Sequence, residues 1–311
     1  DLQSRVHWEE NLEQWTKLAL QAKEEKSFPW PKASNVKFPV LATAAMQFNA
    51  RAYPTLVPSD GRLVHTEVVG ADPSGEKKKR ADRISDFMSY QLLKQMEGWD
   101  EQMDKLLLIL PIVGTCFKKT YWDSIKKRNC SKLVMPKDLV VNYWATSLEE
   151  TERKTERIAM TKRVFKERVN AGIFCDVDLA PPSSAGVTLA RGDTKSNIQD
   201  MVPGRDDDTT PYIFLEQHTF CDLDDDGYAE PYIVTFEEKS KKVVRIVARF
   251  DEKSIITDDD GELIKIEPIE YYTKYSFIPN PDGGFYDIGF GLLLSPLNES
   301  INTIINQLVD A

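Results

Sequence analysis

Residues 267–311 read EPIEYYTKYSFIPNPDGGFYDIGFGLLLSPLNESINTIINQLVDA, and the rest of the chain is organised around them. The aromatic run at 271–278 has the composition of a β-strand. The next six residues, PNPDGG at 279–284, predict a turn, because proline fixes φ and glycine accepts positive φ. Ser295 then offers an N-cap hydroxyl, and Pro296 stands where a starting helix needs no backbone N–H. The stretch therefore predicts a strand, a turn and a helix.

The predicted helix at 297–309 has two chemically different faces. One is an apolar stripe at helical spacing, formed by Leu297, Ile301, Ile304, Ile305, Leu308 and Val309. The other carries amides and hydroxyls, with Glu299 as its only charged residue. Solvated helix faces usually carry Lys and Glu, so this polar face indicates contact with more protein. The candidate contacts between subunits are Asn298, Asn302 and Asn306, and the alternative is a solvated face that is polar by chance.

Length and charge limit the possible functions. A chain of 311 residues that is 41% hydrophobic can bury a core and form two or more sub-domains. Its formal net charge of -10 does not attract nucleic acid by bulk electrostatics. Contact with DNA would therefore require local basic residues or a ring that encloses the duplex.

Cysteine and histidine usage argues against a structural metal site. The four cysteines, Cys116, Cys130, Cys175 and Cys221, are widely spaced without a C-x-x-C pair, and the chain has three histidines. We therefore expect free thiols in a reducing cytosol, with no metal and no cofactor. No apolar run has the length of a membrane span. Because the chain begins at Asp1 without Met and ends without a helix stop signal, we expect a longer protein.

The patterns predict an α+β fold in five regions. Residues 1–135 form a wing-like region of helices and small sheets, and 136–175 a strand and a helix. Residues 176–211, rich in proline, serine and glycine, form a flexible loop or linker. Residues 212–270 form a β-meander, and 271–311 the turn and the start of an amphipathic helix. The expected helices include 4–25, 40–52, one that ends near 97, one from Trp99 to about Leu110, and 165–171. The helix that ends near 97 has the inner stripe Ile84, Phe87, Met88, Leu92 and Met96, and Pro111 and Gly114 end the helix that begins at Trp99. The expected strands include 63–69, 116–122, 132–135, 139–143 and 157–163.

The loop GADPSGEKKKR at 70–80 comes close to a phosphate-binding P-loop. A P-loop requires Lys directly after its second glycine, followed by Ser or Thr for magnesium. Here Glu76 takes the Lys position and Lys77 the Ser/Thr position, and a carboxylate would repel the phosphates. We therefore expect a solvated helix entry without ATP hydrolysis. The basic cluster of Lys77, Lys78, Lys79, Arg80 and Arg83 leaves a phosphate or partner contact open.

The turn at Asp222, Asp224, Asp226 and Gly227 has the first half of a calcium-binding loop. Ile233 stands where the closing bidentate Glu is needed, so we expect a charged, solvated turn between two strands. The acidic clusters could alternatively hold magnesium ions, as in a metal-dependent nuclease. No nucleophile-elbow or zinc-protease motif is present, and we expect no catalytic residues.

Several segments resemble the portal proteins of tailed bacteriophages, especially those of short-tailed phages. They occur in the same order and cover most of the chain from Trp30 onward. Their motifs are structural and not catalytic. They are FPWPKASNVKFPVLATAAMQFNARAYPTLVP at 28–58, DLDDDGYAEPYIVTF at 222–236, FIPNPDGGFYDIGFG at 277–291 and LNESINTIINQLVDA at 297–311.

The resemblance implies a homo-oligomeric ring, usually of twelve subunits, at one capsid vertex of the virion. It implies a channel for double-stranded DNA, a terminase motor that supplies the ATPase, contacts with capsid and scaffolding proteins, and a tail adaptor. Assembly would take place in the host bacterial cytoplasm, without a membrane. An acidic channel suits this role, because negative charge lets the duplex slide. The alternatives are another head–tail connector or adaptor of the virion, and the nuclease.

Overall fold

The computed structural model describes residues 1–22, 30–31, 33–58, 61–182, 207–259 and 261–311. It is 37% helical and 23% strand, which confirms the α+β class. The helical elements are η1 (Gln3–Arg5), α1 (Val6–Ala19), α2 (Val40–Leu56), α3 (Glu76–Tyr90), η2 (Gln91–Gln95), α4 (Trp99–Val113), α5 (Lys162–Asn170), η3 (Glu252–Ser254) and α8 (Phe290–Asp310). The strands are β1 (Thr115–Asp123), β2 (Arg128–Val134), β3 (Leu139–Val141), β4 (Lys154–Met160), β5 (Tyr212–Cys221), β6 (Glu230–Glu237), β7 (Val243–Ala248), β8 (Ile255–Thr257), β9 (Leu263–Ile266) and β10 (Tyr272–Ser276).

The strands form three antiparallel sheets, with the orders β10-β1-β2, β3-β4-β5-β6-β7 and β8-β9. The five-stranded sheet joins β3 and β4 to the meander, so the regions 136–175 and 212–270 share one sheet. Strand β10 returns to β1 and ties the C-terminal region to the first. Most of the predicted linker at 176–211 lies outside the described residues, since these omit 183–206.

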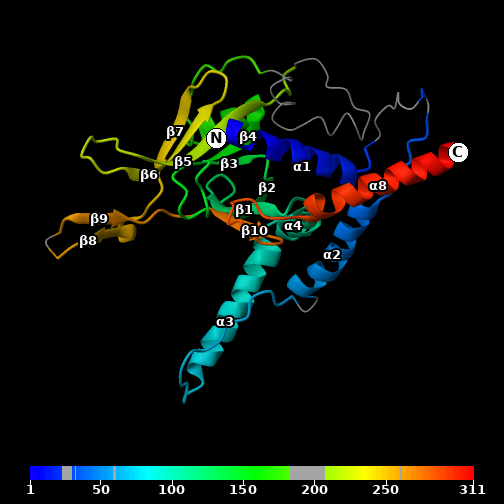
Figure 1. The fold of residues 1–311 in the computed structure, drawn as a ribbon. Helices are drawn as coiled ribbons and strands as arrows, with labels where there is room; N and C mark the ends of the chain where they lie inside the picture. Colours follow the sequence, from blue (N-terminus) through cyan, green and yellow to red (C-terminus); the bar gives the residue numbers. More distant parts are fainter. Residues whose placement is uncertain (23–29, 32, 59–60, 183–206, 260) are drawn as a thin grey trace.

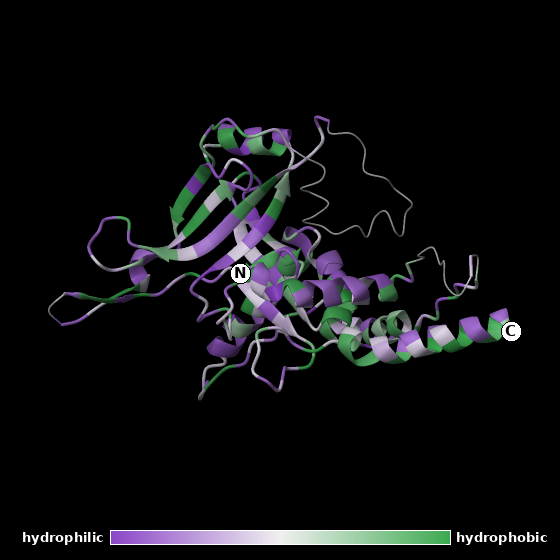
Figure 2. Cartoon of the chain, turned by 45° about the horizontal axis from the view of Figure 1, so that its top comes forward, coloured by the Kyte–Doolittle hydropathy of each residue, from purple (hydrophilic) through white to green (hydrophobic). Residues whose placement is uncertain are grey.

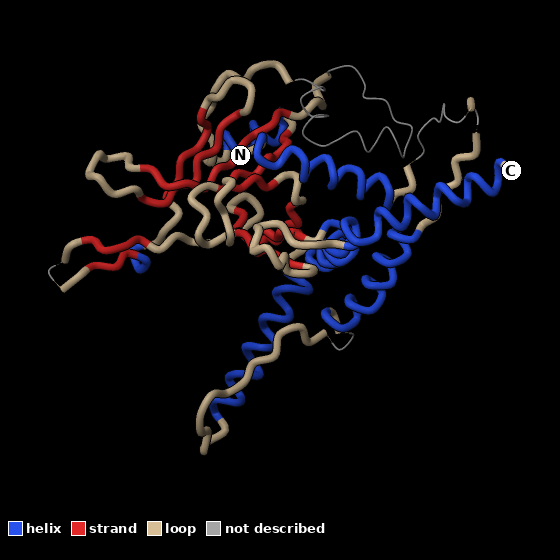
Figure 3. Tube along the Cα trace, in the orientation of Figure 1, coloured by secondary structure: helices blue, strands red, loops and turns tan. Residues whose placement is uncertain are grey.

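Helices α2, α4 and α8 lie on one side of the molecule and most strands on the other, as Figure 3 shows, whereas α5 packs on the five-stranded sheet through Phe165 and Phe214. Helix α4 connects the two sides. Its apolar residues Met103, Leu106, Leu107 and Leu110 are buried together with Cys116 at the start of β1. This confirms the predicted helix and its end at Gly114, whose φ is 91°, but Pro111 lies inside the helix and does not end it. A second cluster, with Phe117, Val134, Leu139, Tyr272 and Phe285 among its members, lies between the three-stranded sheet and β3.

A close approach between Gly114 and Gly289 fixes where α8 begins. A Cβ on Gly114 would lie 2.2 Å from the carbonyl oxygen of Asp287, and one on Gly289 would lie 2.5 Å from the nitrogen of Gly114. The chain before α8 is therefore held against the end of α4. As a result α8 begins at Phe290, and the predicted start at Ser295 and Pro296 was wrong. Pro296 instead lies inside the helix, where it removes one backbone hydrogen bond.

Other predicted boundaries also change. Residues 63–69 form no strand, because they lie along α3 and not beside another strand. The first helix ends at Ala19 and not near residue 25, and α2 continues through Pro54 to Leu56. Strand β4 begins at Lys154, three residues earlier than predicted. The turn at 279–284 and the helix end at Gly172 occur as predicted, with Gly172 at φ of 70°, but α5 begins at Lys162, three residues earlier than predicted.

Candidate functional site

Helix α8 is attached to the body by a ladder of polar side chains. Asn298, Asn302, Asn306 and Asp310 recur at every fourth residue, so they lie along one side of the helix. Each offers a side-chain oxygen to a backbone N–H of the segment 34–41. The pairs are Asp310 Oδ1 with Ser34 N at 3.0 Å, Asn306 Oδ1 with Val36 N at 2.6 Å, Asn302 Oδ1 with Phe38 N at 2.7 Å, and Asn298 Oδ1 with Leu41 N at 3.2 Å.

The spacing of this asparagine ladder follows from backbone geometry. Four helical residues rise about 6 Å, and two extended residues span about 6.6 Å. An extended segment therefore presents every second N–H opposite every fourth helical residue, as Ser34, Val36 and Phe38 do, whereas the fourth donor, Leu41, lies three residues further on in the first turn of α2. All three asparagines are buried, and Asn298 is only 1% exposed. They bind their own chain, so the prediction that Asn298, Asn302 and Asn306 form contacts between subunits is corrected.

Most of the apolar stripe of α8 faces outward instead, whereas Ile301 and Ile305 are half-buried. Ile304 is 55% exposed and Leu308 is 73% exposed, and Leu293 and Leu297 are also exposed. Figure 2 shows hydrophobic residues along α8 toward the C-terminal end of the chain, where the helix extends beyond the body. An amphipathic helix normally buries its apolar face. Here the hydrogen bonds of the ladder decide the orientation, and the apolar face is left on the surface.

Helix α3 has the same inverted orientation. Its buried residues are Ser85 and Ser89, whereas Ile84, Phe87 and Met88 of the predicted inner stripe are exposed. The Ser89 hydroxyl accepts a hydrogen bond from the backbone N–H of Val64 at 3.1 Å, and the Ser85 hydroxyl donates to the Val64 carbonyl. The small serines thus allow an extended segment to lie against the helix. The predicted stripe was wrong for these three residues and right for Met96, which is buried.

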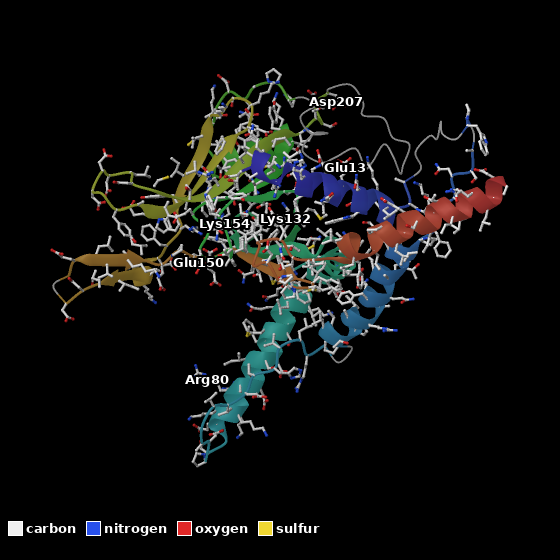
Figure 4. All side chains as sticks on the ribbon, viewed as in Figure 1. Glu13, Arg80, Lys132, Glu150, Lys154 and Asp207 are labelled. Atoms are coloured by element: carbon white, nitrogen blue, oxygen red, sulfur yellow. The ribbon has the colours of Figure 1, made fainter. Side chains whose placement is uncertain are left out.

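A buried ionic network joins the two larger sheets. Lys119 Nζ on β1 lies 2.8 Å from Glu156 Oε2 on β4 and 2.5 Å from Glu216 Oε1 on β5. Lys132, labelled in Figure 4, reaches the other oxygen of Glu156 at 3.1 Å. The Tyr272 hydroxyl on β10 donates to Glu156 Oε2 at 2.9 Å. Both oxygens of Glu156 are therefore paired, and the network connects strands distant in sequence.

Electrostatics keep this network charged. Burial alone would raise the pKa of Glu156 and Glu216. Lys119 together with Lys132 at Glu156, and Lys119 together with a hydrogen bond from His218 at Glu216, outweigh burial and hold both pKa values below their usual range. Burial lowers the pKa of Lys119, but the two carboxylates outweigh it, so the net shift is upward. Burial lowers the pKa of His218, which lies beside Glu216 with its Nε2 3.4 Å from Oε1. The carboxylates are thus ionised and the imidazole neutral near pH 7.

The geometry of the network is better suited to a structural role than to a catalytic one. Lys119, Glu156, Glu216 and His218 are all buried. Two surface hollows identified within the described residues lie elsewhere. One of about 440 Å³ lies between α1 and α8, and the other is lined by residues of η2, β1 and β2. Sequence reasoning missed the network, although charged residues within the apolar patterns of β4 and β5 were a signal.

The acidic turn and the basic cluster lie at the surface. The carboxylates of Asp222, Asp224 and Asp226 are exposed and within 4.8 Å of one another. Two of them stabilise the turn itself, because Asp222 accepts from the N–H of Gly227 at 2.9 Å and Asp226 from that of Tyr228 at 2.7 Å. The basic cluster occupies the first turns of α3, and Figure 4 shows Arg80 far from the body.

We expect the acidic turn not to bind calcium at micromolar concentrations. Ile233 cannot supply the closing bidentate ligand, so the dissociation constant should be roughly millimolar or weaker. Calorimetric titration of calcium into the wild type checks this, with the Asp224→Asn, Asp226→Asn double variant as control. Micromolar binding that the double variant abolishes would contradict the expectation.

Comparison with known proteins gives no family assignment. No protein-family model matches the sequence, and a search of curated proteins finds no match. Among the described helices, none combines the length and hydropathy needed to cross a membrane. The surfaces themselves, and above all the outward apolar stripe of α8, therefore provide the functional argument.

Proposed function

We propose that this chain is a subunit of a homo-oligomeric ring, the portal ring of a tailed bacteriophage capsid, through which double-stranded DNA passes. The outward apolar stripe of α8, formed by Leu293, Leu297, Ile304 and Leu308, carries the proposal. Fully burying one such side chain contributes about 1.5–3 kcal/mol. A contiguous exposed apolar surface on a helix already attached by its polar side indicates a contact with protein.

The apolar stripe alone supports a ring of any kind. The resemblance of residues 28–58, 222–236 and 277–311 to portal proteins supports a portal ring in particular. A net charge of -10 supports a channel that does not retain the DNA backbone. The role is structural, and we assign the chain no catalytic step. Its partners in the virion would be the terminase motor during packaging, capsid and scaffolding proteins, and a tail adaptor. The family's helical barrel and crown are not assigned to any described residues.

Adding charge to the stripe should prevent assembly without unfolding the subunit. The test is the Leu297→Glu, Ile304→Glu double variant. Leu297 and Ile304 are both exposed in the wild type, so the melting temperature of the variant should differ by only a few degrees. Desolvating two carboxylates in an apolar contact should weaken ring formation at least tenfold. Native mass spectrometry measures the ring mass, and negative-stain images of the wild type should show a ring with a central hole.

The matched control is Thr303→Glu, Gln307→Glu, which adds the same charge at exposed positions of α8 outside the stripe. This variant should assemble like the wild type. A wild type that remains monomeric at every concentration would overturn the proposal. Normal rings from the stripe variant would show that the stripe is not the contact.

A further inference from the structure

Two arms project from the body of the molecule. The α3 arm comprises residues 61–90, that is, α3 and the extended segment beside it. The hairpin arm comprises residues 251–267, with η3, β8 and β9. Figures 1 and 3 show the two arms leaving the body in different directions, the hairpin arm to the left and the α3 arm downward, with their tips apart. Contact between them would therefore involve two copies of the chain.

Neither arm has a core of its own. The buried residues of α3 are Ser85 and Ser89, and among the residues of β8 and β9 only Ile266 is buried. A helix of 15 residues and a two-stranded hairpin are both marginal in water without packing. Each arm also exposes apolar side chains. On the α3 arm these include Ile84, Phe87 and Met88, and on the hairpin arm Ile255, Ile256, Leu263 and Ile264.

The start of α3 and the hairpin arm carry opposite charges. Residues 77–83 contain five basic residues and one acidic residue, for a net charge of +4, within an α3 arm whose six basic and five acidic residues give it +1 overall. Residues 251–267 contain seven acidic residues and two basic ones, for a net charge of -5. Two copies of the basic segment 77–83 would repel each other, and so would two hairpin arms. The favourable pairing is an α3 arm with a hairpin arm, where the exposed apolar residues of both can also be buried.

We propose that the α3 arm of one copy docks on the hairpin arm of a second copy, head to tail. Such a contact is heterologous, and repeating it closes a ring when the rotation between copies divides a full turn. The inference rests on the proposed ring and names one contact within it. Salt should weaken the contact, because its charges lie at the surface.

Charge reversal in each arm tests the contact. The first variant, Lys79→Glu, Arg80→Glu, Arg83→Glu, makes the α3 arm acidic. The second, Glu252→Lys, Asp259→Lys, Glu262→Lys, makes the hairpin arm basic. All six side chains are exposed, so both variants should fold, as thermal melting and circular dichroism can verify. Each variant alone should need at least tenfold higher concentration to assemble, because it pairs like charges.

Mixing the two variants should restore assembly. The acidic α3 arm of the first meets the basic hairpin arm of the second, and the unchanged arms of the two variants also match. A single chain with all six substitutions should assemble for the same reason. Mass photometry of nuclease-treated protein at low and high salt measures each sample.

The outcomes separate this contact from the ring itself. If the wild type never assembles, the proposed function fails. If the wild type assembles and both single-arm variants assemble equally well at low salt, the contact is wrong and the ring stands. If the mixture does not recover assembly, or if the first variant loses only binding to added duplex DNA, the basic residues serve another partner and the contact is overturned.

Discussion

Replacing Glu156 with leucine is expected to lower the free energy of unfolding by about 3–5 kcal/mol, the typical cost of removing one partner of a buried ion pair. Glu156 is 1% exposed and pairs with Lys119, Lys132 and the Tyr272 hydroxyl. Its loss leaves Lys119, also buried, with Glu216 as its remaining carboxylate partner among the residues that the structure describes. Urea unfolding at pH 7 measures the change.

The pH dependence of stability checks the same network. The pKa values of Glu156 and Glu216 lie below their ordinary value of 4.5 in the folded protein. The unfolded chain therefore takes up protons first as the pH falls below about 4.5, and stability is lost there. The pKa of His218 lies below its ordinary 6.5, so as the pH falls this histidine takes up its proton in the unfolded chain before it does so in the folded protein. The free energy of unfolding therefore begins to fall below about pH 6.5. Lys119 stays charged throughout this range.

Wild-type stability should therefore fall from pH 7 to pH 4, with a steeper slope below about 4.5. The His218→Gln variant should lose the part of the slope between about pH 6.5 and 5. The matched control is Glu149→Gln, which removes an exposed carboxylate from the loop before β4. This variant should leave the pH dependence of stability unaltered. A Glu156→Leu loss below 1 kcal/mol would contradict a stabilising network.

Replacing Asn302 and Asn306 with leucine should cost roughly 2–6 kcal/mol, at about 1–3 kcal/mol for each backbone N–H left without its acceptor. The affected donors are the N–H groups of Phe38 and Val36. The amide of Asn306 also donates to the Val36 carbonyl at 3.1 Å, so a carbonyl loses its partner too. We expect the segment 33–39 to detach from α8.

Hydrogen exchange of residues 33–41 should accelerate in this variant, and urea unfolding should give the stability loss. The control is Thr303→Leu, Gln307→Leu, which adds the same apolar side chains at exposed positions of α8. It should alter stability by less than about 1 kcal/mol. A stable Asn302, Asn306 variant with fully protected amides at 33–41 would contradict the ladder.

The sequence by itself determined the elements whose signals are local. The buried side of α4 follows from its apolar spacing, and its end follows from Gly114. The turn at 279–284 follows from its prolines and glycines, because these limit φ within the turn itself. Strands β5, β6 and β7 of the predicted meander were also predictable, since their patterns depend on adjacent residues, but β9 pairs with β8 in a separate sheet and not with the meander.

Only the tertiary structure decided which way α3 and α8 face. Helical spacing shows that a helix has an apolar and a polar side, but both sides can meet protein. On α8, Asn298, Asn302 and Asn306 reach the backbone of a segment more than 250 residues away in the chain, as the hydrogen bonds from Leu41, Phe38 and Val36 show. The network around Glu156 likewise depends on β1, β4 and β5 meeting in space. Such contacts depend on distances between remote residues, whereas a spacing pattern reports only on neighbours in the chain.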